Sequence, residues 1–296
     1  NFQTRRNHMR TLLTGSKGQL ARCFRDRLPE NWELIATDST SLDITDTEAV
    51  RNMVQNFQPD AIVNAAAFTA VDKAEAHVST AFAVNATAVH NLASAARACQ
   101  ARFIHISTDY VFDGTNKTPY KEQDYTNPQS VYGRTKVSGE LLALAANPDS
   151  VIIRTSWLFS EYGNNFVKTM IRLAGERDNL SIVHDQTGSP TYAGDLAQAI
   201  ITLLQQPVAP RGIYHYGGNK SVTWYEFAQA IFQAAQQQDP DFKIPQLNAI
   251  TTDQYPLPAP RPAYSIMDCQ KIENECGIKA SDWQKALNEI IGKLDN

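Results

Sequence analysis

The sequence predicts an α/β protein built on a doubly wound parallel sheet, with a smaller C-terminal portion. Two observations support this prediction. Through the first half of the 296 residues, short apolar or β-branched runs alternate with longer segments of helical period. Such runs are typical of parallel strands that are buried on both faces of a sheet. A turn containing two glycines follows the first run, at the point where a strand would lead into a helix.

The expected elements of the first half follow one another in strict alternation. We expect strands at residues 10–14, 34–38, 61–64, 103–107 and 151–154. We expect helices between them at residues 19–28, 47–57, 78–99 and 132–146. Asp46 is a suitable N-cap for the second of these helices, because its carboxylate can accept hydrogen bonds from the first backbone N–H groups.

The alternation loosens after residue 157. We expect helices at 165–177, 193–206 and 223–238, a strand at 180–183 and a turn at 185–190. The prolines between residues 255 and 262 exclude a helix or central strand, since Pro has no backbone N–H, and predict an ordered surface loop over a site.

Domain boundaries follow from this change of pattern. We expect residues 9–157 to form mainly a cofactor-binding domain. Residues 158–296 should form mainly a substrate-binding portion, with some segments that return to the first domain. Residues 1–8 are polar and are expected to form a disordered extension.

Composition excludes several classes of function. Hydrophobic residues make up 43% of the chain and charged residues 20%, which is ordinary for a soluble enzyme. A net charge of −4 gives no reason to expect nucleic acid or an anionic membrane as a partner. No segment approaches the roughly 18 apolar residues that span a bilayer, and the N-terminus lacks the apolar core of a secretory signal.

The cysteines and histidines show no metal-binding spacing. Neither a C-x-x-C nor an H-E-x-x-H motif occurs, so we expect no metal site and no disulfide framework. Scattered thiols fit a reducing cytoplasm, where we expect the protein to reside.

The glycine turn has the features of a dinucleotide site. Gly15 and Gly18 allow backbone N–H groups at a helix start to approach a pyrophosphate. Asp38 lies 38 − 15 = 23 positions after Gly15, near the place, roughly 20 residues on, where a carboxylate binds the adenosine ribose. Asp38 disfavours a 2′-phosphate and Lys17 favours it, so we expect NADH with NADPH tolerated. The alternatives are an ordinary β-α turn and an Asp38 that only caps its strand.

Tyr132 and Lys136 are one helical turn apart, so the phenol and the ammonium share one face of the helix. Lowering the Tyr pKa of about 10 by roughly three units takes about 4 kcal/mol, which one ammonium at about 4 Å can supply. Thr108 follows an apolar run and can hydrogen-bond both the phenol and a substrate carbonyl. The three residues predict nicotinamide-dependent chemistry at a carbonyl. The alternatives are a solvated helix surface and a simple loop start.

These residues resemble the active-site trio of the extended short-chain dehydrogenase/reductase family, whose fold is of the Rossmann type. Further motifs narrow the resemblance to dTDP-4-dehydrorhamnose reductases, and it covers the chain from Met9 to the C-terminus. The most specific motif is Ala-Val-Asp-Lys-Ala-Glu at residues 70–75. The other matching segments are residues 63–69, 107–112, 131–136, 154–157, 163–166, 185–186, 190–191 and 261–262.

The resemblance implies a role for each matching residue. Tyr132 would donate the proton, Lys136 would hold the cofactor ribose and lower the Tyr pKa, and Thr108 would polarise the ketone. The residues implied to line the cofactor are Gly18, Gln19, Leu20, Asp38, Asp43, Ile44, Ala67, Phe68 and Thr69.

On the substrate side, the resemblance places Asp109 and Trp157 in the sugar-nucleotide site. The alternative for Trp157 is an ordinary core aromatic. Arg261 could pair with a substrate diphosphate, for which its guanidinium is suited.

Three departures from the family pattern limit what can be transferred. Phe68 stands where relatives often carry His, and Ala263 and Tyr264 stand where Gly and Asn are usual. Some relatives dimerise through magnesium held partly by a Glu of the first helix, and Cys23 occupies that position here. We therefore expect no metal, and both a monomer and a homodimer remain open.

The implied activity is reduction of dTDP-4-dehydro-L-rhamnose to dTDP-L-rhamnose with NADH or NADPH, the last step of dTDP-L-rhamnose synthesis for surface polysaccharide. One alternative is an epimerase or dehydratase of another nucleotide sugar, although dehydratases usually show Asp-Glu where this chain has Asp109 and Tyr110. The other is a non-catalytic regulatory subunit on the same fold, a role that would not require the acid–base trio.

Overall fold

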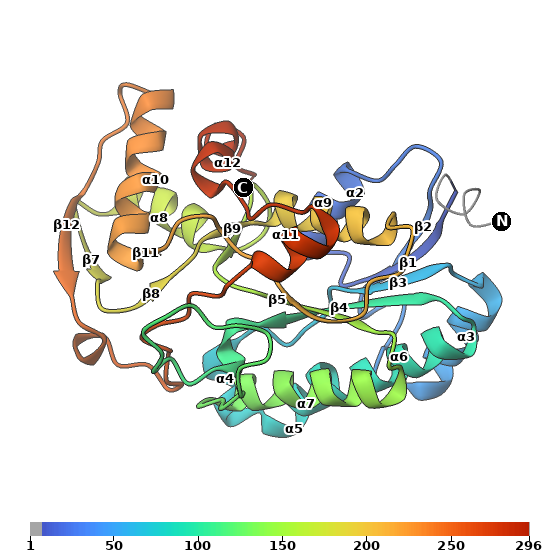
Figure 1. Ribbon diagram of the computed structural model, residues 1–296. Coiled ribbons are helices and arrows are strands. Elements are labelled where there is room, and N and C mark those ends of the chain that lie inside the picture. Colours follow the sequence, from blue (N-terminus) through green and yellow to red (C-terminus); the bar gives the residue numbers. More distant parts are fainter. Residues whose placement is uncertain (1–7, 296) are drawn as a thin grey trace.

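The central element of the computed structural model is a parallel sheet of six strands in the order β10-β5-β4-β3-β1-β2 (Figure 1). The structure describes residues 8–295, so the expected extension over residues 1–8 lies, apart from His8, outside the described residues. The strands are β1 (Arg10–Thr14), β2 (Glu33–Ala36), β3 (Ala61–Asn64), β4 (Arg102–Thr108), β5 (Val151–Thr155) and β10 (Gly212–His215). The predicted fold class, a doubly wound parallel sheet, is confirmed.

The strand order reverses beside β1. This strand pairs with β2 on one side and with β3 on the other, and both pairings are parallel. The chain therefore leaves β1 towards one edge of the sheet and resumes at β3 on the other side. In doubly wound sheets, ligands bind outside the carboxyl ends of the strands at such a point.

Helices cover both faces of the sheet (Figure 1). On one face lie α2 (Gln19–Asp26), α9 (Ala193–Leu204) and α11 (Gln270–Cys276), and on the other α3 (Thr47–Phe57), α6 (Ala88–Ala98) and α7 (Val131–Ala146). Each face has its own apolar core, with Leu13 in the first and Leu12 in the second. Asp46 caps α3, as predicted, by accepting a hydrogen bond from the Ala49 N–H.

The predicted helix at 78–99 is confirmed as a continuous helical run over residues 78–98, which contains a π-helical turn that the sequence did not predict. The structure has α4 (Val71–Ala76), α5 (Val78–Phe82), a π-helical turn η1 (Ala83–Thr87) and then α6. α7 packs closely on the π-helical turn, where a Cβ on Gly139 would lie 2.0 Å from the Asn85 carbonyl oxygen. A wider turn is thus accommodated only because the facing residue is glycine.

The C-terminal portion has a separate apolar core, centred on Phe227 and Trp283. It contains α8 (Phe166–Glu176), α10 (Trp224–Gln238), α12 (Trp283–Ile290) and the parallel pair β7 (Asn179–Val183) with β12 (Gln246–Ile250). Two-residue strands complete it: β6 (Leu158–Phe159) with β9 (Thr191–Tyr192), and β8 (Thr187–Gly188) with β11 (Val222–Thr223). The short 3₁₀ turn η3 (Thr252–Gln254) also lies in this portion, whereas the 3₁₀ turn η2 (Asp109–Val111) follows β4 of the main sheet.

The sequence did not predict β10, β12, α11 or α12. β12 has the polar or small residues Gln246, Asn248 and Ala249 within five positions, and this composition obscures its strand character. β10 belongs by sequence to the second half but pairs with β5 in the main sheet. Among residues 8–295, no helix is both long enough and apolar enough to cross a membrane.

Candidate active site

The predicted trio comes together where β4 ends and α7 begins. Thr108 is the last residue of β4, and Tyr132 and Lys136 lie on successive turns of α7. Ser130 fixes the start of α7 by accepting a hydrogen bond of 3.0 Å from the Gly133 N–H. Tyr132 and Lys136 are buried, and the Thr108 hydroxyl lies beside the Tyr132 phenol. Local sequence thus places an acid, a cation and a hydroxyl at one edge of the sheet.

The expectation that Lys136 lowers the pKa of Tyr132 is wrong for this structure. Burial raises the pKa of the Tyr132 phenol above its ordinary value, and the nearby carboxyl of Asp109 raises it further. The Lys136 ammonium instead donates a hydrogen bond of 2.7 Å to the Ile106 carbonyl. Burial lowers the pKa of Lys136 to about 8, against the opposing effect of Glu140. Tyr132 is therefore held in its protonated form.

A buried polar layer lies beneath the trio and was missed by sequence reasoning. Arg154 and Glu140 form an ion pair with an N–O distance of 2.7 Å, and both side chains are 3% exposed. The Ser107 hydroxyl donates a hydrogen bond of 2.5 Å to the same carboxylate. Glu140 follows Lys136 by four residues on α7, and this spacing was the available signal.

The glycine turn fits a dinucleotide phosphate. Gly15 has a φ of +69°, and a Cβ there would lie 2.7 Å from the Ala65 backbone at the end of β3. α2 begins after Gly18 with no side-chain cap and no acidic residue in its first turn. The first N–H groups of this helix, which include those of Gln19 and Leu20, are therefore available to an anion.

Asp38 lies just beyond β2, and its carboxylate is engaged by its own loop. One oxygen accepts hydrogen bonds from the backbone N–H groups of Thr40 at 2.9 Å and Ser41 at 3.0 Å. The other oxygen lies 3.4 Å from the Lys17 ammonium. The Ser41 and Thr40 hydrogen bonds lower the pKa of Asp38 well below its ordinary value. Asp38, which disfavours a 2′-phosphate, and Lys17, which favours it, thus form an ion pair.

The other implied cofactor residues lie on two neighbouring loops. Asp43 bonds to Thr45 in its own loop, and Ile44 is buried in the core on the α3 side. The loop 67–69 is held by Asn85, whose amide accepts from the Phe68 N–H at 2.8 Å and donates to the Phe68 carbonyl at 3.0 Å. Asn85 is a positioning residue that the sequence did not reveal.

Asp109 follows the trio and is buried. Its Oδ1 accepts a hydrogen bond of 3.1 Å from the Thr108 hydroxyl. Its Oδ2 is buried and has no hydrogen-bond partner among the described residues. Burial raises the pKa of Asp109 to about 6. Asp109 is therefore a second acid at the site, and the Thr108 hydroxyl lies between it and Tyr132.

Trp157 lies beyond β5 in a left-handed conformation, with a φ of +48°. Such backbone conformations are costly for a bulky residue and occur often at functional sites. The indole stacks on Trp224 with ring centroids 3.5 Å apart and planes at 9°. Gly188 packs against the indole so closely that a Cβ built on this glycine would lie 2.5 Å from the ring. One face of the indole is thus already covered.

Arg261 is engaged by a carboxylate. Its two terminal nitrogens bond to the two oxygens of Asp72, at 2.5 Å and 2.9 Å. Asp72 lies on α4, within the most specific family motif. The guanidinium therefore has a protein partner in the place where a substrate diphosphate was expected.

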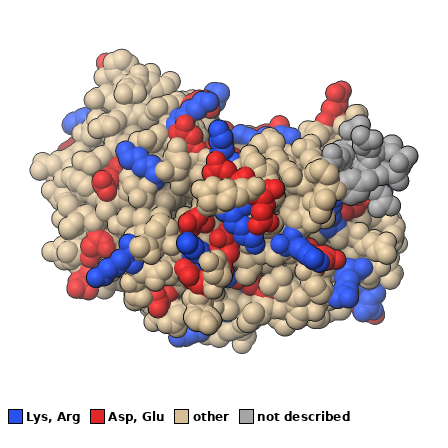
Figure 2. Space-filling view, viewed as in Figure 1, with Lys and Arg blue, Asp and Glu red and all other residues tan. Residues whose placement is uncertain are grey.

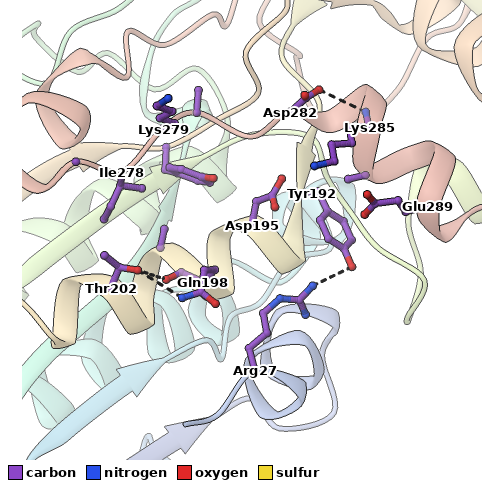
Figure 3. Close-up of a pocket in the computed structure, with 15 residues that line it drawn as sticks. Arg27, Tyr192, Asp195, Gln198, Thr202, Ile278, Lys279, Asp282, Lys285 and Glu289 are labelled. Atoms are coloured by element: carbon purple, nitrogen blue, oxygen red, sulfur yellow. Dashed lines mark hydrogen bonds between the residues drawn. The ribbon is translucent and has the colours of Figure 1, made fainter. Parts of the chain in front are cut away.

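A cavity of about 420 Å³ lies elsewhere, between α9, α12 and the end of α2 (Figure 3). Arg27 and Tyr192 point toward each other across it and are joined by a hydrogen bond of 3.3 Å. Its lining includes acids and bases in equal number: Arg27, Lys279, Lys285, Asp195, Asp282 and Glu289. None of the trio lines it. Within residues 8–295, no group of three or more His, Cys, Asp or Glu side chains is arranged to hold a metal.

A parallel sheet with a glycine turn after β1 and a Thr–Tyr–Lys trio at the edge of β4 and α7 is the arrangement of the extended short-chain dehydrogenase/reductase class. The family described as RmlD substrate binding domain matches residues 9–296. The chain belongs to this family.

Several similar proteins carry the name dTDP-4-dehydrorhamnose reductase. A dTDP-4-dehydrorhamnose reductase of Aggregatibacter actinomycetemcomitans is 48% identical over 287 residues, which cover 95% of this chain and 98% of that protein. The crystal structure of a dTDP-4-dehydrorhamnose reductase from Clostridium acetobutylicum has a TM-score of 0.90 at 40% identity and covers 96% of this chain and 99% of its own.

The structure of the Bacillus anthracis dTDP-4-dehydrorhamnose reductase, in complex with NADP, also has a TM-score of 0.90. It is 36% identical and covers 95% of this chain and 98% of its own. The predicted family resemblance is confirmed.

Proposed function

We propose that this protein reduces dTDP-4-dehydro-L-rhamnose to dTDP-L-rhamnose with NADH or NADPH, as the last step of dTDP-L-rhamnose synthesis. The observation that supports this most directly is the contact of the Thr108 hydroxyl with the buried Tyr132 phenol, one helical turn from Lys136. The relatives that carry the reductase name cover nearly the whole chain.

The nicotinamide cofactor, when bound, supplies the hydride that reduces the sugar ketone. Tyr132 would donate its phenolic proton to the oxygen of that ketone. Thr108 holds the same oxygen through its hydroxyl. Lys136 binds the cofactor ribose and keeps a positive charge near the phenolate that forms.

The cofactor residues would be those at the glycine turn and its two neighbouring loops. Gly15, Gly18, Gln19 and Leu20 would bind the pyrophosphate, and Asp38 the adenosine ribose. Asp43, Ile44 and the loop Ala67, Phe68, Thr69 would line the remainder. The substrate side would contain Thr108, Asp109 and Trp157, with Arg261 at its border. Residues 9–157 would thus mainly hold the cofactor, and residues 158–296 mainly the dTDP-sugar.

Neither nucleic acid nor a membrane is proposed as a partner. On the face shown in Figure 2, basic and acidic side chains are interspersed, with no extended field of one sign. The net charge of −4 agrees with this distribution. We place the activity in the cytoplasm, where the unpaired thiols of Cys23, Cys99, Cys269 and Cys276 stay reduced.

The test is oxidation of NADH or NADPH in the presence of 4-keto nucleotide sugars that differ in base and sugar. We expect turnover with dTDP-4-dehydro-L-rhamnose and a product that comigrates with dTDP-L-rhamnose. An epimerase or dehydratase would convert a nucleotide sugar without net consumption of NAD(P)H, and a regulatory subunit would convert none. Either result would contradict the proposal.

A further inference from the structure

One segment of the C-terminal portion contacts the sheet domain beside the trio. We call residues 259–265 the strap. The Thr187 N–H donates a 2.8 Å hydrogen bond to the Ala263 carbonyl, and the Ser265 N–H donates a 2.9 Å bond to the Thr187 carbonyl. On the other side, Pro262 lies so close to Gly114 that a Cβ on the glycine would be 2.7 Å away. The strap therefore lies between the two parts of the chain.

Asp72 fastens one end of the strap to α4. Its Oδ1 accepts hydrogen bonds from the Ala259 N–H at 3.0 Å and from Arg261 at 2.5 Å, and its Oδ2 accepts from Arg261 at 2.9 Å. The side chains of Arg261 and Asp72 are 19% and 32% exposed. Pairing with Arg261 lowers the pKa of Asp72, so both groups are charged. A bidentate pair of this kind fixes orientation as well as distance.

Two routes lead from this ion pair to Tyr132. The Arg261 guanidinium lies near the side chain of Tyr110, whose ring meets the Tyr132 ring edge-on, with centroids 5.4 Å apart and planes at 77°. On the other side, Val71 and Ala74 of α4 pack in the small apolar cluster that contains Tyr132. Tyr110 and α4, the two neighbours of the ion pair, thus both pack beside Tyr132.

We propose that Asp72 and Arg261 are a positioning pair, which holds the strap, Tyr110 and α4 in place so that the Tyr132 phenol points at the substrate ketone. This inference rests on the proposed function. In this role Arg261 acts through Tyr110 and Asp72, and it does not bind the substrate diphosphate. A diphosphate would have to displace a carboxylate that already occupies both arms of the guanidinium.

The experiment compares Asp72→Asn, Arg261→Gln and the double variant in the full-length protein. The measurements are kcat and KM for the dTDP-sugar, Kd for NADPH and Kd for dTDP alone. Arg211→Gln is the matched control, since Arg211 pairs with Asp149 at 3.5 Å on the open surface. Misplacing reacting groups by about 1 Å can cost roughly 10²-fold, so we expect each single variant to lower kcat by about tenfold or more.

The proposal further requires KM and both Kd values to stay within about threefold of the parent. The double variant should be no worse than the poorer single variant, because residues in direct contact do not act additively. Weaker dTDP binding in Arg261→Gln would overturn the proposal, as would additive losses or an unchanged kcat. If neither single variant folds, Arg261→Lys replaces them, because it keeps the charge but cannot form two parallel hydrogen bonds to the carboxylate. An unchanged kcat in Arg261→Lys would also overturn the proposal.

Hydrogen exchange separates this proposal from the proposed function. The Ala259 N–H should exchange faster in Asp72→Ala, which removes the acceptor, than in the parent, and this measurement needs no substrate. Unchanged exchange overturns the positioning pair. If the parent reduces no 4-keto dTDP-sugar, the proposed function fails, whereas the exchange result still decides whether Asp72 holds the strap.

Discussion

The sheet domain and the C-terminal portion hold their functional side chains in different ways. In the sheet domain, Thr108 ends the seven-residue strand β4, and Tyr132 and Lys136 lie on the regular helix α7. In the C-terminal portion, β6, β8, β9 and β11 have two residues each, and Trp224 of α10 orients Trp157, which directly precedes this portion and packs on its core. Chemistry in the first region depends on local sequence, and orientation in the second depends on contacts between distant segments.

This difference separates the effects expected of substitutions. Changes at the edge of the sheet should affect proton transfer or cofactor binding and leave the substrate pocket intact. Changes in the C-terminal portion should affect the position of the dTDP-sugar and leave cofactor affinity intact. Strap variants should test the border between the two, since the strap contacts both.

The largest effect is expected from Tyr132→Phe. Losing a general acid should lower kcat by about 10²- to 10⁴-fold, while NADPH affinity stays nearly unchanged because the ring remains. Steady-state kinetics and cofactor titration check this result. Tyr125→Phe is the control, since Tyr125 is 97% exposed. Turnover within tenfold of the parent would remove Tyr132 from its assigned role.

Trp157→Ala tests the other region. We expect KM for the dTDP-sugar to rise and kcat to fall by up to roughly 10²-fold, because the sugar loses a wall and shifts relative to Tyr132. Kd for NADH should barely move, and Trp157→Phe should show a smaller loss. If NADH affinity collapses while KM holds, Trp157 supports the cofactor site and the division between the two regions is wrong.

Asp109→Asn gives a pH-dependent effect. The pKa of Asp109 is about 6 in the folded protein, raised by burial, against about 3.9 in an unfolded chain. The contribution of Asp109 to stability is therefore fully present below about pH 4 and is lost as pH rises through 6, a change on the order of 2–3 kcal/mol. The Asn variant lacks this loss. Its free energy of unfolding relative to the parent should be higher at pH 7 than at pH 4 by about that amount.

Denaturant unfolding at the two pH values measures this difference. Asp149→Asn, with a side chain 79% exposed, controls for removal of a negative charge. A pH-independent difference between the Asp109→Asn variant and the parent would show that Asp109 ionises normally in the folded state.

Asp38→Ala is expected to have the smallest effect. Removing the carboxylate relieves its repulsion of a 2′-phosphate and releases Lys17, so the ratio of kcat/KM for NADPH to that for NADH should rise severalfold. Glu48→Ala, an exposed acid on α3, should leave the ratio unchanged. The same ratio in Asp38→Ala as in the parent would mean that Asp38 does not face the ribose.

Features with a local cause could be predicted from the sequence. Apolar runs identified β1, β3, β4 and β5, and the spacing of Tyr132 and Lys136 placed both on one helix face. Features that depend on a distant neighbour could not. Asn85 lies in a π-helical turn that has room only beside Gly139 of a distant helix, and Arg261 meets Asp72 only in the folded chain. The direction of the Tyr132 pKa shift was also missed, because burial outweighs a neighbouring charge that is directed at a backbone carbonyl.

The ion pair of Glu140 and Arg154 restricts how this chain can change during evolution. Removing one partner leaves an uncompensated charge in the interior, which costs about 3–5 kcal/mol, whereas replacing both by apolar residues of similar volume can be neutral. Most domains are only about 5–15 kcal/mol stable, so the single-substitution intermediate is close to unfolding. The two positions should therefore change together or not at all, and a lineage that has lost one acid should also have lost the base.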